Sequence, residues 1–330
     1  MENKYSNLTN LSLSMAVFLA TDEYDHNNDP KSISVTTLLK PIKQIILTSR
    51  LAPGSLIVDV TSMIKSRIGT AIHSAAEKAW LNNHKSVMKS LGYSDYVINQ
   101  VKVNPTDEEI ERFEENQLEY IPVYVEQRTE KQFEDFTITG QYDFIFAGTL
   151  EDIKSTSVYT YMNKSKDLDY RLQGSIYRWL NPDKIISDYM DIQYIFTDWS
   201  ASGKFQNKNY PPAQQLPYRI SLMSLQETEA FIKNKLNTLK QYWDMPEEDL
   251  PMCTDAELWK SPTVYKYYKD PEKISRRSTK NFTNLSEAQI RLNDDGNVGM
   301  IIPVEGTAKA CQYCPAFTIC KQKDLYYSNN

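Results

Sequence analysis

The pattern of apolar and polar positions divides the chain into a helical first third and a strand-rich middle. Apolar residues recur at helical spacing from residue 34 to residue 80, with a turn at Pro53 and Gly54, and the charged span 84–120 is also predicted to be helical. From Ile121 onward, β-branched and aromatic residues alternate with polar ones, which predicts strands.

The strand-rich middle contains three predicted strand segments. They are IPVYVEQR from residue 121, FTITGQYDFIFAGTLEDIKST from residue 136 and MDIQYIFTDW from residue 190. Helices are predicted over Asp167–Leu180, between the second and third segments, and over Leu225–Trp243. A strand–helix–strand order favours an α/β fold with helices on the faces of one sheet.

Composition places the chain among ordinary globular proteins. Its 330 residues include 37 basic and 43 acidic ones, for a formal net charge of −6, and 41% of them are hydrophobic. These values exclude a disordered tail, a collagen-like chain and a coiled coil. The mild net acidity disfavours a protein that coats nucleic acid through bulk charge, but it allows a local basic groove or a metal-neutralised site. A P-loop is excluded, because GTLEDIKST has Ile153 where glycine is required.

Three segments follow from these patterns. Residues 1–33 are predicted to form a short amphipathic helix and a polar loop that cap the core. The α/β core itself is predicted to be residues 34–250. Residues 251–330 are predicted to form an irregular region packed on that core. The apolar run Leu11–Ala20 is far shorter than the ~20 residues that span a bilayer, and the residues before it lack the positive charge of a signal peptide. We therefore expect a cytoplasmic protein with no membrane contact.

The most informative feature is a predicted hairpin. A two-residue turn at Ala147–Gly148 would place Asp143 directly opposite Asp152, with their Cβ atoms ~4.5–5.5 Å apart. Opposed like charges destabilise a sheet, so the pair needs a cation, a raised pKa or a different register. A divalent metal is the simplest of these, and Lys154 projects from the same face, as in sites that hydrolyse phosphodiesters. The alternative is an exposed hairpin with ordinary charges.

Four other residues could complete such a site. His73 lies in GTAIH, near the start of a predicted helix, and a neutral imidazole is a common metal ligand. Gln173 and Tyr177 are four residues apart and share one helical face. Glu126, on the preceding strand, could assist. Each of them also has a structural interpretation, as a packing or surface residue.

The four cysteines all lie near the end of the chain. Cys311, Cys314 and Cys320 form C-x₂-C-x₅-C, and Cys253 lies upstream. Four thiols suit an iron–sulfur cluster or a zinc ion, although zinc usually takes its ligands as two close pairs. Free thiols or a disulfide stay open as alternatives.

A basic, hydroxyl-rich run, SRRSTK from residue 275, lies between the first cysteine and the other three. Its Arg276, Arg277 and Lys280 suit contacts with phosphates, and a solvated loop explains them equally well.

Four short motifs in order, GTAIH (69–73), GQYD (140–143), EDIK (151–154) and LQGSIY (172–177), resemble those of the PD-(D/E)xK nuclease superfamily. The resemblance is to its RecB-like and Cas4-like branch, which includes exonucleases of tailed phages. It implies a restriction-endonuclease-like core with a mixed central sheet flanked by helices, a helical N-terminal part and a C-terminal region held by an iron–sulfur cluster.

The resemblance also implies a role for each residue. Mg²⁺ or Mn²⁺ would be bound by His73, Asp143, Asp152 and the backbone carbonyl of Ile153. Lys154 would be the catalytic lysine, and Gln173 and Tyr177 would contact the DNA backbone or orient the site. A [4Fe–4S] cluster, with Zn²⁺ as the alternative, would be held by the cysteines, namely Cys253, Cys311, Cys314 and Cys320.

The function implied by the resemblance is that of a metal-dependent DNA exonuclease, with exonuclease favoured over endonuclease. It would act in phage or CRISPR-type DNA processing, replication or recombination, inside a bacterial host cell if phage-encoded. Its partners would be single-stranded DNA or duplex ends and recombination or replication proteins, and self-association stays open. The alternatives are a non-catalytic DNA-end-binding subunit of a processing complex and an iron–sulfur redox protein.

Overall fold

The chain forms two units in the computed structural model, which describes residues 4–21, 29, 31–52 and 54–327. The first unit comprises Met1–Leu39 and Gly54–Leu236, and the second comprises Lys40–Pro53 and Asn237–Asn330. Residues 40–53 thus group with the C-terminal part of the chain rather than with their neighbours in sequence. The segments 1–33, 34–250 and 251–330 remain a prediction.

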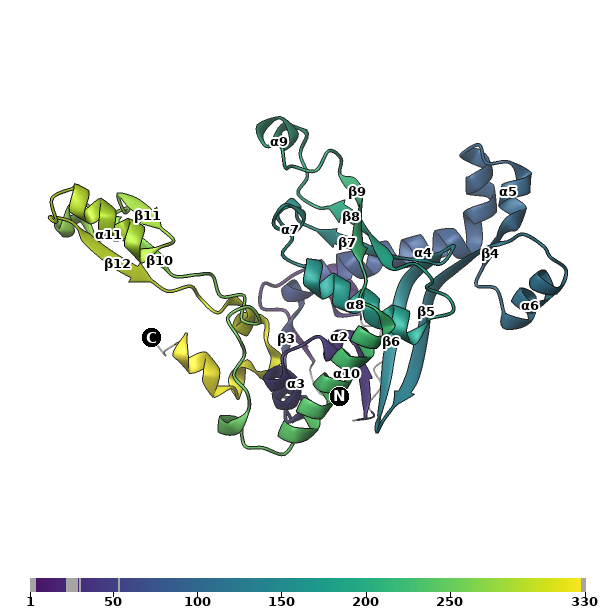
Figure 1. Cartoon of the computed structure of the whole chain (residues 1–330), viewed down its shortest axis with the longest axis horizontal. Helices are drawn as coiled ribbons and strands as arrows, with labels where there is room; N and C mark the ends of the chain where they lie inside the picture. Colours follow the sequence, from purple (N-terminus) through teal and green to yellow (C-terminus); the bar gives the residue numbers. More distant parts are fainter. Residues whose placement is uncertain (1–3, 22–28, 30, 53, 328–330) are drawn as a thin grey trace. The chain divides into compact units, whose positions relative to one another are not determined.

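A seven-stranded mixed sheet forms the centre of the first unit (Figure 1). Its path runs β4-β5-β6-β7-β8-β9, and β2 pairs with β6. The strands are β2 (Ser32–Ser34), β4 (Val101–Val103), β5 (Ile121–Phe133), β6 (Phe136–Phe146), β7 (Thr149–Thr156), β8 (Tyr189–Phe196) and β9 (Gln215–Ser221). The pairs β2–β6, β4–β5 and β7–β8 are parallel, and the others are antiparallel. The expected mixed sheet is present, and its strands β2, β4 and β9 are ones that the sequence pattern did not predict.

Helices α2, α4 and α8 pack on strands of this sheet. The helices up to α10 are α1 (Leu13–Ala20), α2 (Val35–Leu38), α4 (Ile64–Ser90), α5 (Asp95–Gln100), α6 (Asp107–Glu115), α7 (Val158–Asn163), α8 (Asp167–Leu180), α9 (Ala201–Gln206) and α10 (Leu225–Tyr242), with α3 in the second unit. The bounds predicted for α8 are confirmed, and α10 ends one residue early. The first unit also has the strand pair β1 (Tyr5–Ser6) and β3 (Val58–Asp59), and the 3₁₀ helix η1 (Val60–Met63).

Two details of the helical prediction are wrong. The span 84–120 is not helical throughout, because Val101–Val103 pairs in parallel with β5 and interrupts the helices. His73 is not near the start of its helix, since α4 already begins at Ile64. The predicted polar loop at 22–31 and the turn residue Pro53 fall largely outside the described residues. No helix in the described part of the chain is long and apolar enough to cross a bilayer.

The predicted hairpin has the predicted register. Phe146 pairs with Thr149 and Phe144 with Glu151. Ala147 and Gly148 both have positive φ, 47° and 83°, as a two-residue turn between twisted strands requires. The ladder ends at the Phe144 pair, so Asp143 lies just beyond it.

Strand β6 has two different partners along one edge. β5 pairs along its whole length on the other edge, while β7 pairs with residues 144–146 and β2 with residues 137–139. Among the residues that the structure describes, the segment Gly140–Asp143 therefore has no neighbouring strand on the edge that β2 and β7 share. This opening in the sheet positions the candidate site.

The second unit is more ordered than predicted for an irregular region. Its antiparallel strands β10 (Val264–Tyr268), β11 (Lys280–Phe282) and β12 (Met300–Val304) pack with α11 (Leu285–Asp294) around Tyr267, Phe282 and Ala288. It also contains α3 (Ile42–Ser49) and the 3₁₀ helices η2 (Glu247–Asp249), η3 (Pro271–Lys273), η4 (Lys309–Tyr313), η5 (Pro315–Thr318) and η6 (Lys321–Leu325). The prediction missed the strands because each is short.

Substitution of Gly174, in α8, tests how this helix packs on the sheet, and Gly69, in α4, serves as the control. A Cβ at Gly174 would overlap Met190 Sδ and lie 3.0 Å from Leu222 Cδ2, and both side chains are buried. Gly174→Val should therefore lower the free energy of unfolding by about 1–3 kcal/mol in urea titrations. As a control, Gly69→Ala should raise it by up to about 1 kcal/mol, because its Cβ meets only Ser155 Oγ at 3.7 Å. An unchanged midpoint for Gly174→Val would contradict this packing.

Candidate functional site

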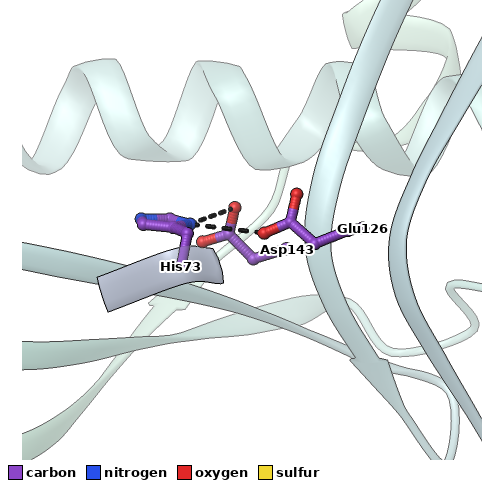
Figure 2. A group of neighbouring side chains, drawn as sticks. All are labelled: His73, Glu126 and Asp143. Atoms are coloured by element: carbon purple, nitrogen blue, oxygen red, sulfur yellow. Dashed lines mark ion pairs between the residues drawn. The ribbon is translucent and has the colours of Figure 1, made fainter. Parts of the chain in front are cut away.

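Three side chains from different elements converge at the opening in the sheet (Figure 2). His73 comes from α4, Glu126 from β5 and Asp143 from β6. His73 Nδ1 lies 3.2 Å from Asp143 Oδ1 and 3.5 Å from Glu126 Oε1. One ligand atom from each residue lies within 4.8 Å of the others, so the group can hold a metal ion. These donors, one imidazole and two carboxylates, suit a divalent cation.

Glu126 is more central than the sequence indicated. The pairing of Val125 with Phe144 and of Gln127 with Tyr142 places Glu126 opposite Asp143 across the two strands. Glu126 has a φ of +49°, a left-handed conformation that is unfavourable for a non-glycine residue. Such strain is concentrated at functional sites, where the surrounding structure holds it in place.

The carboxylate of Glu126 is only partly satisfied by the protein. Gln141 Nε2 donates to Glu126 Oε2 at 2.9 Å, whereas Glu126 Oε1 is buried and accepts no hydrogen bond. A buried oxygen without a donor is costly unless a cation approaches it. The orphaned oxygen faces His73, on the side where a metal would lie.

His73 balances the two carboxylates when no metal is bound. Its hydrogen bond to Asp143 and the nearby Glu126 carboxylate raise the pKa of the imidazole to about 10. A histidine must be neutral to bind a metal, so a bound cation would take over the charge balance that the proton provides. The residues present therefore fit a divalent ion.

Asp152 and Lys154 form a buried ion pair beside this group. Lys154 Nζ lies 2.5 Å from Asp152 Oδ2, in an ion pair. Burial raises the pKa of Asp152, which is 2% exposed, to about 6. Burial opposes the charge of Lys154, but the carboxylates of Asp152 and Asp143 outweigh it and raise the lysine pKa. The two side chains share a face, as the alternation along β7 predicts.

The backbone of β7 connects this ion pair to Asp143. The N–H of Ile153 donates to Asp143 Oδ2 at 2.8 Å. Asp143 thus contacts both His73 and the strand that carries Asp152. A ligand role for the Ile153 carbonyl, like that of Asp152 itself, remains a prediction.

Gln173 and Tyr177, the two residues predicted to share one helical face, also lie at the site. Gln173 Nε2 donates to the Tyr177 hydroxyl at 3.1 Å, and burial raises the pKa of Tyr177. The absence of a side chain at Gly140 permits this arrangement, because a Cβ there would lie 2.8 Å from Tyr177 Cε1. This close approach accounts for the glycine in GQYD.

A cavity of about 750 Å³ opens onto these residues. His73, Glu126, Asp143 and Tyr177 line it. Such a volume accommodates a small-molecule-sized ligand, which includes a nucleotide unit.

The four cysteines line a second, small cavity of about 40 Å³ in the second unit. All four thiols are free, and burial raises the pKa of Cys253 to about 12. Gln322 holds this remote cysteine in place: its Oε1 accepts from the Cys253 N–H and its Nε2 donates to the Cys253 carbonyl, each at 2.9 Å. The folded chain therefore brings Cys253 to the other three cysteines.

The basic run lies elsewhere in the second unit. Arg276, Arg277 and Lys280 are exposed, around the loop between η3 and β11. Lys280 lies over the ring of Phe282, 4.8 Å from its centre. Their contact with DNA remains a prediction.

Comparisons with known proteins find similar solved structures but no family. No family model and no curated protein matches the chain. Among solved structures, the chain is similar to SSO0001, with 15% identity, a TM-score of 0.37, and coverage of 70% of this chain and 87% of the other. It is also similar to a phage-related exonuclease from Haemophilus somnus 129PT, with 16% identity, a TM-score of 0.26, and coverage of 53% and 80%. TM-scores this low do not bear on function.

Glu126 provides a direct test of the metal site. Glu126→Gln should weaken Mn²⁺ binding about tenfold or more, because it removes one of two carboxylates from the three-residue group. Electron paramagnetic resonance of free Mn²⁺ measures this. Glu130→Gln, an exposed position on the same strand, is the matched control and should bind as wild type does. Equal affinities for the two variants would exclude Glu126 as a ligand.

Proposed function

We propose that the chain is a metal-dependent deoxyribonuclease of the PD-(D/E)xK type. The observation that carries this proposal is the group of His73, Glu126 and Asp143 beside the buried Asp152–Lys154 ion pair, at an opening in a mixed sheet. A histidine and two carboxylates that line a cavity, with a buried carboxylate and its paired lysine beside them, suit phosphodiester hydrolysis. Action as an exonuclease in phage or CRISPR-type DNA processing extends the proposal and rests on the sequence resemblance.

Each residue has a distinct task in this proposal. When bound, Mg²⁺ or Mn²⁺ would supply charge stabilisation and lower the pKa of a water. His73, Glu126 and Asp143 would hold the ion. The Lys154 ammonium has three donors and uses one toward Asp152, so the others can hold a water or a phosphate oxygen. Asp152 fixes the position of that ammonium.

The decisive variant is Lys154→Ala. It should abolish Mn²⁺-dependent degradation of end-labelled single- and double-stranded DNA, because the ammonium that orients the reacting oxygens is lost. Lys85→Ala, an exposed position on α4, should degrade DNA as wild type does. Circular dichroism and Mn²⁺ binding would show that Lys154→Ala keeps its fold and its metal group. Wild-type protein that binds DNA ends without cleaving them would instead favour a non-catalytic end-binding subunit.

We also propose that the cysteine cavity holds a [4Fe–4S] cluster. Four free thiols lining one cavity, with the remote one fixed by Gln322, support a four-thiolate metal centre. Raised thiol pKa values are costly for thiolates without a metal, and a metal removes that cost. The cluster would hold the C-terminal segment to the segment around Cys253.

Elemental analysis of anaerobically purified protein tests the cluster. We expect about four iron atoms per chain in wild type. Cys253→Ser should lose most of the iron and lower the thermal stability of the protein, because it removes a ligand that closes a long loop. One zinc ion per chain would establish the zinc alternative, and protein without metal would indicate free thiols.

A further inference from the structure

A second cavity of the first unit is lined by lysines and tyrosines. It has a volume of about 750 Å³ and lies between α7 and the segment after β8. We call it the lysine groove and define it by Tyr161, Lys164, Lys204, Lys208, Tyr210 and Tyr218. Because α7 follows β7 and α9 follows β8, and these strands are parallel, both helices lie beyond the same end of the sheet (Figure 1).

The charged residues that line the lysine groove are all lysines, and the one carboxylate bonded to its lining, among the residues that the structure describes, is Asp167, which accepts from Tyr218 at 2.6 Å. Lys164, Lys204 and Lys208 are exposed, and none of them forms an ion pair with a residue that the structure describes. Within the described chain, the residues that line the groove include no aspartate or glutamate. Three uncompensated lysines around one hollow, in a chain of net charge −6, mark a site for an anionic partner.

The loop that presents two of these lysines is held in a defined shape. The hydroxyl of Tyr210 accepts a hydrogen bond from the Ser200 N–H at 2.9 Å, and Trp199 Nε1 donates to the Pro211 carbonyl at 3.0 Å. Gly203 packs against the ring of Tyr210, where a Cβ would lie only 2.6 Å from Cζ. The lysines therefore project from a built surface.

Aromatic rings give the groove a second kind of contact. Tyr161, Tyr210 and Tyr218 line it, and Phe205, which follows Lys204, is 87% exposed. The three tyrosines are half-buried, and Phe205 lies next to a lining residue in sequence rather than in the lining itself. Lysines bind phosphates, and an exposed ring such as Phe205 stacks on bases that are not already stacked in a duplex. This combination fits a single strand of nucleic acid better than duplex DNA or a free anion.

The groove is connected to the candidate active site by ring contacts. Lys154 Nζ lies 5.7 Å from the ring centre of Tyr170, which contacts Tyr194 at 6.3 Å. Tyr194 in turn contacts both Tyr161 and Tyr218, with ring centres 5.9 Å apart in each case. The same packed layer thus supports Lys154 and the groove.

We propose that the lysine groove binds single-stranded DNA that extends from the active site. This inference rests on the proposed nuclease function for its substrate and assigns to it a strand preference. The groove would hold the phosphates of unpaired nucleotides through its lysines and their bases through its rings. A substrate long enough to reach both sites would then bind more tightly than one confined to the metal site.

Measurement of DNA binding in a cleavage-deficient variant tests whether the lysine groove binds single-stranded DNA. In the Lys154→Ala background, fluorescence anisotropy with labelled oligothymidylate would compare Lys204→Ala/Lys208→Ala with Lys85→Ala/Lys89→Ala. Both pairs are spaced four residues apart and exposed, and Lys89 forms only a surface ion pair with Asp95. The groove variant should lose affinity about tenfold, and its salt dependence should decrease by about 1.4 in log–log slope, since each single-strand phosphate contact contributes about 0.7. Phe205→Ala should weaken binding without changing that slope.

The outcomes separate this inference from the proposed function. Equal affinities of the groove and control variants for oligothymidylate would overturn the proposed role of the lysine groove. An equal loss of affinity for duplex DNA of the same length would also overturn it. Thermal melts that match wild type would exclude misfolding as the cause of a loss. If protein with Lys154 intact binds oligothymidylate through the groove but cleaves no DNA, the nuclease proposal fails and the groove stands.

Discussion

The burial of carboxylates where the sheet opens is the constraint on which the site depends. Asp143 and Asp152 are 9% and 2% exposed, and two buried negative charges side by side require cations. The protein supplies one from α4 as His73 and one from β7 as Lys154. The positions of the long helix and of the hairpin follow from this charge balance as much as from apolar packing.

The opening itself is a consequence of strand pairing. Since β2 and β7 share one edge of β6, the residues between them can accept ligands rather than strands. Gly140 admits the ring of Tyr177 into this gap, and the left-handed Glu126 breaks the ladder on the other edge. Gly140 lies three residues before Asp143 on β6, and Glu126 lies opposite Asp143 on β5. Both departures from regular strand geometry therefore border the residues that form the site.

The sequence predicted the parts of the site that local spacing controls. The turn at Ala147–Gly148 fixed the β6–β7 register, and alternation placed Lys154 beside Asp152. The central position of Glu126 could not be found in this way, because it depends on the β5–β6 turn, where Glu134 has a φ of +53°. A glutamate is an unusual residue for that conformation, so composition gives no turn signal.

The difference between local spacing and long-range contacts also explains the other features that the sequence did not predict. The strand β4 has only three residues, and its pairing with β5 is a long-range contact that no local period reveals. The grouping of residues 40–53 with the C-terminal part of the chain is likewise set by packing between distant segments. The cysteines were recognised from spacing, but the residue that fixes Cys253 was not, because a glutamine near a chain end has no distinctive pattern.

Net charge was a weak guide because charge acts locally in this molecule. Acidic residues gather in stretches such as α6, whereas Lys164, Lys204 and Lys208 surround a hollow with no described acidic lining. With a screening length of about 8–10 Å at physiological salt, a phosphate in that hollow would interact with these lysines and little with distant acids. An acidic chain can therefore present a surface for nucleic acid, provided that folding separates the charges. Here Trp199 and Tyr210 hold the loop after β8, which carries Lys204 and Lys208, in place.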